Sequence, residues 1–191
     1  MRKPNISVIG LGYVGLPVAI AFDEAGYNVI GIDLNEERIN QLKSNFDKTY
    51  EISEDRLINC DINFTINPNT VSDANFHIVT VPTPIDEYNN PDFRFIISAS
   101  QLLGKEIKKG DIIVYESTVY PGATEEIAVP IIENISGMKI NKDFSVGYSP
   151  ERINPADPKH TFENIKKIVS ATNSIALETI EKVYADVVKA G

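Results

Sequence analysis

Three glycines early in the chain have the spacing of a phosphate-binding loop. Gly10, Gly12 and Gly15 lie in "SVIGLGYVGLPVAIAF", after a short apolar run and before helix-forming residues. In a G-x-G-x-x-G pattern the first glycine allows a tight turn, the second lets backbone approach a pyrophosphate, and the third allows close helix–strand packing. Amides at the helix N-terminus then bind the phosphates without a basic side chain. The pattern predicts a dinucleotide site that includes Val14 and Tyr13, whose ring either covers the cofactor or packs against protein.

An aspartate at the end of the next apolar run completes the pattern. Asp33 closes the run "YNVIGID" and lies 18 residues after Gly15, close to the roughly 20 that usually precede the acid binding the ribose 2′-hydroxyl. A carboxylate there repels a 2′-phosphate, so the sequence favours NAD over NADP. Arg38 leaves three alternatives open, because it can receive a 2′-phosphate, lie against the adenine or bind the diphosphate. The competing interpretation is a strand–turn–helix unit whose glycines are needed only for packing.

Composition restricts the partners that this site can have. The chain has 191 residues and a formal net charge of −9, with basic residues scattered singly or in pairs, which argues against nucleic acid. The single cysteine, Cys60, cannot form an internal disulfide, and His77 and His160 lack metal-ligand spacing. No apolar run approaches the roughly 20 residues of a membrane span. We therefore expect a cytoplasmic protein with no metal site and no membrane partner, in which these three residues have structural roles.

The elements that must position the site follow from hydrophobic periodicity. Apolar, β-branched runs alternate with segments of helical period, and this repeated order is typical of a Rossmann-like, doubly wound α/β fold. We expect a mostly parallel sheet with helices on both faces, forming one NAD-binding domain over residues 1–191. The expected strands are 5–10, 27–33, 62–66, 76–81, 111–117, 144–149 and 166–171, and the expected helices are 13–26, 35–45, 92–110, 121–136 and 173–190.

Four stretches carry a resemblance to a known family. They are "VIGLGYVGLPVAIAF" (8–22), "TVPTP" (80–84), "ESTVYPGATEE" (116–126) and "GYSPERINPADP" (147–158). Together they resemble the N-terminal NAD-binding domain of the UDP-glucose/GDP-mannose dehydrogenase family. The last stretch is similar to the branch that acts on UDP-N-acetyl-hexosamines in surface-polysaccharide synthesis.

The resemblance implies a two-step oxidation of a sugar C6 hydroxymethyl group to a carboxylate with two NAD. In the family a cysteine thiolate traps the aldehyde, a thioester forms, and water hydrolyses it. That cysteine, in a glycine-rich motif, has no counterpart in this sequence, nor has the long helix through which family members usually dimerise. The resemblance therefore implies a homo-oligomeric complete enzyme with a UDP-sugar substrate. We expect the present chain, alone, to bind NAD as a possible monomer without turnover.

Five residues are matched to family positions by their motifs. The resemblance places Pro82, Thr83, Ser117, Thr118 and Glu151 against NAD. It also makes Thr118 the residue that positions the hydrolytic water and Glu151 the carboxylate that activates this water. The alternative is a purely structural role: each threonine caps a strand or helix end, and Glu151 only forms an ion pair with a neighbour such as Arg152. The UDP-glucose branch has a second glutamate where this chain has Pro155, so the water network of that branch is not transferred.

Two further functions remain open on the sequence. A β-hydroxyacid or 6-phosphogluconate-type dehydrogenase shares the first fifty residues in outline, but it predicts neither "ESTVYPG" nor "SPERINP". A standalone NAD-sensing module would need no catalytic residues. The presence of a downstream glycine-rich cysteine motif in the reading frame distinguishes the enzyme from the module.

Overall fold

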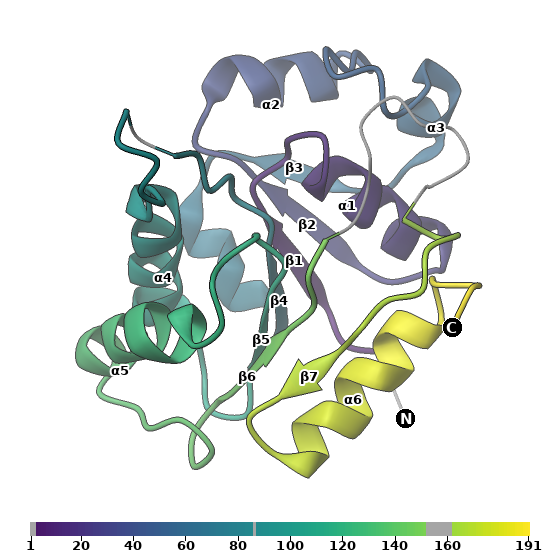
Figure 1. Cartoon of the computed structure of the whole chain (residues 1–191). Coiled ribbons are helices and arrows are strands. Elements are labelled where there is room, and N and C mark those ends of the chain that lie inside the picture. Colours follow the sequence, from purple (N-terminus) through teal and green to yellow (C-terminus); the bar gives the residue numbers. More distant parts are fainter. Residues whose placement is uncertain (1–2, 86, 152–161) are drawn as a thin grey trace.

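A twisted, mostly parallel sheet forms the centre of the molecule (Figure 1). The computed structural model describes residues 3–85, 87–151 and 162–191. The sheet has seven strands in the order β3-β2-β1-β4-β5-β6-β7, and only β7 runs antiparallel to its neighbour. The strands are β1 (Ile6–Ile9), β2 (Val29–Ile32), β3 (Asn63–Thr65), β4 (Phe76–Val79), β5 (Ile112–Tyr115), β6 (Ser145–Tyr148) and β7 (Ser170–Ala171).

Helices cover both faces of the sheet, as the sequence predicted. One core contains side chains of α1, α2, α3 and α6, and the other contains side chains of α4, α5 and the 3-10 helix η1. The bounds are α1 (Gly15–Glu24), α2 (Glu36–Lys43), α3 (Glu54–Asn59), η1 (Pro68–Asp73), α4 (Arg94–Glu106), the π-helical turn η2 (Thr124–Ala128), α5 (Val129–Ser136) and α6 (Ser174–Ala185). Among the described helices, none is long and apolar enough to cross a membrane.

Strands β1 and β4 explain why the apolar runs are continuous rather than alternating. All four residues of each strand are buried, because neighbouring side chains enter opposite cores. Ile6 and Val8 pack into the core with α1 and α6, whereas Ile9 packs into the core with α4 and α5. A strand covered on both faces requires apolar residues at nearly every position.

The order of the strands creates a crevice. The chain leaves β1 toward β2 and β3 on one side and resumes on the other side with β4, so β1 and β4 are neighbours with connections that diverge. In doubly wound sheets, ligands bind at the carboxyl ends of the strands at this switch point. The glycine loop follows β1 and residues 80–83 follow β4, so both lie at the crevice.

Polar side chains link β1 and β4 to the residue just before β5, away from that edge. The Ser7 hydroxyl lies 2.8 Å from Nδ1 of His77, and Nε2 of His77 lies 3.1 Å from a carboxylate oxygen of Asp111. All three side chains are buried. The hydrogen bonds satisfy groups that would otherwise be buried without partners, and they give His77 a structural role.

Three local features differ from the sequence prediction. Helices α3 and η1 were not expected, since segments of six residues carry little periodicity. Strand β7 has only two residues instead of the expected six, and the helix predicted over 121–136 begins as a π-helical turn at Thr124. Arg152, Pro155 and His160, on which parts of the sequence interpretation depend, lie outside the described residues.

Candidate functional site

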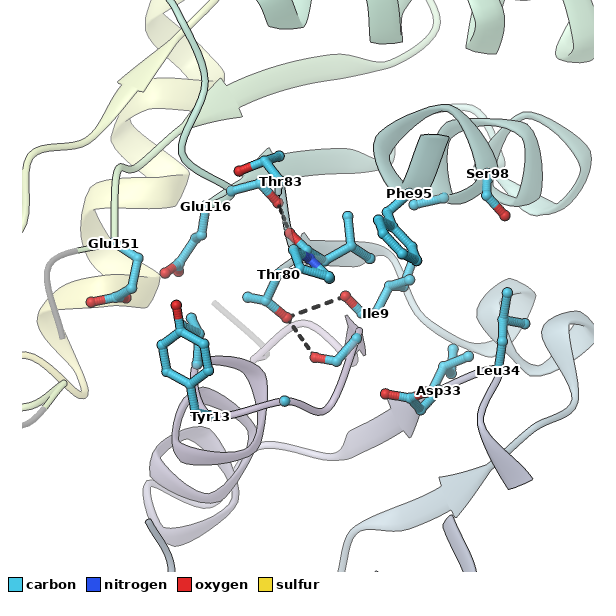
Figure 2. A pocket seen from close by; sticks show the side chains of 18 of the residues that line it. Ile9, Tyr13, Asp33, Leu34, Thr80, Thr83, Phe95, Ser98, Glu116 and Glu151 are labelled. Carbon is cyan, nitrogen blue, oxygen red and sulfur yellow. Dashed lines mark hydrogen bonds between the residues drawn. The ribbon is translucent and has the colours of Figure 1, made fainter. Parts of the chain in front are cut away.

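A cavity of about 570 Å³ opens at the carboxyl ends of the central strands (Figure 2). It runs from the end of β2, across the glycine loop, to the ends of β5 and β6, with α4 forming one wall. Of the residues expected to bind the cofactor, those that line the cavity are Gly10, Gly12, Tyr13, Val14, Asp33, Pro82, Thr83, Ser117, Thr118 and Glu151. The structure therefore brings together residues separated by more than a hundred positions in the sequence.

The glycine loop is held tightly against β4. Gly10 has a positive φ of 95°, and the hydroxyl of Thr80 donates hydrogen bonds to the carbonyls of Ile9 (3.2 Å) and Gly10 (2.7 Å). A Cβ at Gly15 would lie 1.8 Å from the carbonyl oxygen of Gly10, so this position requires glycine for packing. A Cβ at Gly12 would meet nothing within 4 Å, so packing with the protein does not explain that glycine.

The N-terminus of α1 offers hydrogen-bond donors to an anion. Its N-cap is Val14, and within the described chain no side chain caps this end and no acidic residue lies in the first turn. None of the described residues that line the cavity is a lysine or an arginine. Backbone amides and the helix dipole thus remain the groups available for a pyrophosphate, and the open space above Gly12 lets one approach.

Asp33 has its carboxylate at the β2 end of the cavity (Figure 2). One carboxylate oxygen accepts a hydrogen bond from the amide of Leu11 (2.8 Å), and the other accepts one from the amide of Asn35 (2.9 Å). These bonds fix the carboxylate against the glycine loop. Each oxygen has a second lone pair, so the carboxylate can still accept hydrogen bonds from two vicinal ribose hydroxyls.

Arg38 lies behind the glycine loop and does not line the cavity. Its side chain is 4% exposed; Nε donates to the carbonyl of Leu11 (2.7 Å) and one terminal nitrogen bonds the Asp47 carboxylate (2.8 Å). The sequence suggested a contact with a 2′-phosphate, the adenine or the diphosphate, and this arrangement is none of these. The side chain of Arg38 points inward and binds the carbonyl of Leu11, whose amide binds Asp33. Direct contact between Arg38 and a cofactor stays a prediction.

The loops after β4 and β5 are tied to each other. The Thr83 hydroxyl donates to the carbonyl of Thr118 (2.7 Å), and the buried Ser117 hydroxyl donates to the carbonyl of Val81 (2.6 Å). Thr118 and Pro82 are exposed. The expected threonines therefore share one rim of the cavity, and the hydrogen bond of Thr83 joins two loops rather than capping a strand or helix end. Contact of either threonine with NAD stays a prediction.

At the far end, Glu151 belongs to a buried ionic cluster. Nζ of Lys167 lies 2.7 Å from a carboxylate oxygen of Glu116 and 2.7 Å from one of Glu151. The three side chains are at most 7% exposed. The Tyr184 hydroxyl donates to the other oxygen of Glu116, and Lys167 also faces the ring of Phe162, 5.0 Å from the centroid. We call Glu116, Glu151 and Lys167 the carboxylate–lysine cluster.

The cluster perturbs the protonation of its members. Burial, reinforced by the Glu151 carboxylate and opposed by Lys167, raises the pKa of Glu116 to about 7. Burial would lower the pKa of Lys167, but the two carboxylates outweigh burial and raise it. Burial and the Glu116 carboxylate raise the pKa of Tyr184. At neutral pH the lysine is therefore charged, whereas Glu116 can take up or release a proton.

Glu116 should make folding stability depend on pH. Its pKa rises from 4.5 to about 7 on folding, so its contribution is fully present below pH 4.5 and is lost as the pH rises through about 7. The loss is at most about 3 kcal/mol. Urea unfolding at pH 5 and pH 8 should show wild type losing more stability than Glu116→Gln by up to this amount. Equal losses would mean that Glu116 titrates normally.

Cys60 has the structural environment expected from the sequence. It packs against the core under α1, its thiol donates to the carbonyl of Leu57 (3.2 Å), and it does not line the cavity. Burial, with the nearby Asp23 carboxylate, raises the pKa of its thiol. A thiol that stays protonated is a poor nucleophile.

Sequence reasoning missed several residues of the site. Glu116 lines the cavity, as do Leu34, Phe95 and Ser98. An acid directly after the buried run of β5 was a usable sign for Glu116, since charged residues that follow a strand at this edge face ligands. Nothing in the sequence marked Lys167 as a site residue, because it is the second of two adjacent lysines at the start of the apolar run 166–171.

Comparison with known proteins gives a consistent result. The UDP-glucose/GDP-mannose dehydrogenase family, NAD binding domain, matches residues 4–188. Protein CapL of Staphylococcus aureus is 54% identical over 187 residues, which cover 98% of this chain and 44% of that protein. The UDP-N-acetyl-D-glucosamine 6-dehydrogenase of Pseudomonas aeruginosa is 45% identical over 192 residues, covering 100% of this chain and 45% of the relative.

A solved structure shows the same fold. The UDP-D-ManNAc dehydrogenase of Pyrococcus horikoshii superposes with a TM-score of 0.89 at 30% identity, over 97% of this chain and 45% of that one. The chain spans less than half the length of these relatives. The chain therefore belongs to the UDP-glucose/GDP-mannose dehydrogenase family, whose NAD-binding domain it matches along nearly all of its length.

Proposed function

We propose that the chain is the cofactor-binding part of an NAD-dependent UDP-N-acetyl-hexosamine 6-dehydrogenase. One observation carries this proposal: a single cavity joins the carboxylate of Asp33, the glycine loop, and the Thr118–Glu151 end. The named activity of the Pseudomonas aeruginosa relative supports the substrate class. The glycine-rich cysteine motif and the substrate-binding residues would lie outside this chain.

The cavity suggests how NAD would lie. The adenosine ribose would bind Asp33, with the adenine between the exposed side chain of Leu34 and α4, where Phe95 and Ser98 line the wall. The pyrophosphate would cross Gly12 at the N-terminus of α1. The nicotinamide would then reach the rim formed by Thr83 and Thr118, near Tyr13. When bound, NAD supplies the hydride acceptor for the oxidation of the sugar.

The residues at the nicotinamide end can support hydrolysis of a thioester. The exposed Thr118 hydroxyl can orient a water molecule, and the Glu151 carboxylate can accept a proton from it. The Glu151 ion pair expected as the alternative does exist, but its described partner is Lys167. An ion pair on the cavity wall holds the carboxylate in place and does not exclude a role as the base.

Substitution of Asp33 tests the cofactor assignment. Asp33→Ala should weaken NADH binding by about 1.5–3 kcal/mol, the value of a charge-assisted hydrogen bond, with wild type binding NADH more tightly than NADPH. Fluorescence titration of the chain measures both affinities, and Asp73→Ala, which removes an exposed carboxylate near the start of β4, is the charge-matched control. Tighter NADPH binding by wild type would overturn the assignment.

The complete protein would have further partners. We propose a UDP-sugar substrate and a homo-oligomeric assembly, as implied by the family resemblance. We also propose a cytoplasmic location, which fits the free thiol of Cys60. Gel filtration with light scattering of the complete protein, at several concentrations, measures its assembly.

A further inference from the structure

The carboxylate–lysine cluster has more parts than the proposed function uses. A single carboxylate suffices to accept a proton from water, yet the structure places a second buried carboxylate and an ammonium group beside it. Breaking the cluster by removing one partner would be costly, but an intact buried ion pair usually adds little net stability. Stability alone is therefore a weak reason for this arrangement.

We propose that Glu116 and Lys167 are positioning residues that act through Glu151. Lys167 passes on to Glu116 the proton that Glu151 removes from the hydrolytic water. This inference rests on the proposed role of Glu151. Lys167 lies between the two carboxylates at equal distances of 2.7 Å, so one short step on each side transfers a proton. Glu116 and Glu151 both line the cavity, and Figure 2 shows their carboxylates on the same side of it.

The transfer balances in protons and electrons. Water gives a proton to Glu151 while its oxygen forms a bond to the thioester carbonyl carbon. The C–S bond then breaks and its electron pair leaves with the sulfur as a thiolate. Lys167 donates a proton from Nζ to Glu116 and takes the proton from Glu151, which restores the ammonium group and leaves Glu151 ionised. The net change in the cluster is one proton gained by Glu116.

The surroundings of Glu116 suit it to hold this proton. The charged and titratable groups that face it are Lys167 from the segment before β7, Glu151 from the end of β6 and Tyr184 from α6, and Tyr13 of the glycine loop lines the same cavity. Burial raises the pKa of Glu116 to about 7, which lets it gain and release a proton at neutral pH. Phe162 and the ring of Tyr184 cover Lys167.

Hydrolysis of the thioester by the complete enzyme tests the inference through its pH profile. In Glu116→Gln the positive charge of Lys167 acts on Glu151 alone, which makes Glu151 a weaker base. Hydrolysis should slow by about tenfold, and the acid limb of its pH profile should move to lower pH. The first hydride transfer, measured by stopped-flow absorbance of NADH, should keep its rate. A loss of folding stability alone would not move the acid limb.

A carboxylate at the other end of β5 provides the control. Asp111→Asn removes a buried, hydrogen-bonded carboxylate just before β5, at the opposite end of that strand from Glu116, and should leave the pH profile of hydrolysis unchanged. Lys167→Met leaves two buried carboxylates without a cation and can prevent folding. The double variant Glu116→Gln/Lys167→Met removes one charge of each sign and also removes the ammonium group beside Glu151. Glu151 is then a stronger base than in Glu116→Gln, so the acid limb of the pH profile should lie at higher pH in the double variant than in Glu116→Gln.

The titration of Glu116 can be measured on the chain itself, without any enzymatic turnover. Carbon-13 NMR of side-chain carboxyls, with Glu116→Gln for assignment, should show one glutamate that titrates near neutral pH. If no glutamate titrates there, or if Glu116→Gln keeps the wild-type rate and pH profile, the relay is overturned. If Glu151→Gln also hydrolyses normally, the proposed role of Glu151 fails as well; if only Glu151→Gln is slow, the relay alone fails.

Discussion

Glu151→Gln in the complete enzyme should slow thioester hydrolysis by about 10²–10⁴-fold while the first hydride transfer keeps its rate. Glutamine preserves the shape of the side chain and one hydrogen-bond acceptor, but it cannot take a proton from water. Attack by a thiolate needs no such base, so the steps before the thioester should proceed. A burst of NADH should precede slow turnover, and an enzyme–sugar adduct should accumulate.

Rapid quench followed by intact-mass measurement detects that adduct. Glu181→Gln, which neutralises an exposed glutamate on α6, is the matched control and should behave as wild type. Wild-type turnover by Glu151→Gln, or slow turnover with neither burst nor adduct, would show that the pairing of Glu151 with Lys167 is only structural.

Of two alanine substitutions in the glycine loop, one should reduce folding stability and the other should reduce NADH affinity. Gly15→Ala places a methyl group 1.8 Å from the carbonyl of Gly10, so the loop or α1 must shift. We expect a loss of about 2–3 kcal/mol of unfolding free energy. Gly12→Ala meets open space and should change stability by about 0.5 kcal/mol or less, yet its methyl group blocks the approach of a pyrophosphate and should weaken NADH binding at least about tenfold.

Urea unfolding and NADH titration of the same two variants separate folding from binding. Gly12→Ala with normal NADH affinity would show that the phosphates do not cross this glycine. Gly15→Ala with wild-type stability would contradict the close packing of α1 on the end of β1.

The fold could be predicted because its signs are local. Each buried strand is a continuous apolar run bounded by turns, and the loop after β1 has glycines whose spacing is explained by the positive φ of Gly10 and the close contact at Gly15. Elements of two to six residues, such as β7 and α3, were predicted poorly or missed because so few residues show no period.

The site could be predicted only where one motif carries it. Asp33 and the glycines lie within one strand–helix–strand unit, so their spacing in the sequence fixes their geometry. The carboxylate–lysine cluster depends instead on the register of β5 with β6, in which Tyr115 lies opposite Tyr148, and on Lys167, which lies 51 positions from Glu116. Arg38 shows the opposite limit, since its position in the sequence suggested a ligand contact and the structure gives it Asp47 and Leu11.

The placement of NAD along the cavity can be measured directly by amide chemical-shift mapping of the chain with AMP and with NAD⁺. AMP should shift the amides of Leu34 and Asn35 at the Asp33 end and, through its phosphate, that of Gly12, and NAD⁺ should shift these and, in addition, Thr118 and Glu151. Identical shifts from both ligands, or shifts from NAD⁺ that leave the Asp33 end unchanged, would contradict the proposed site.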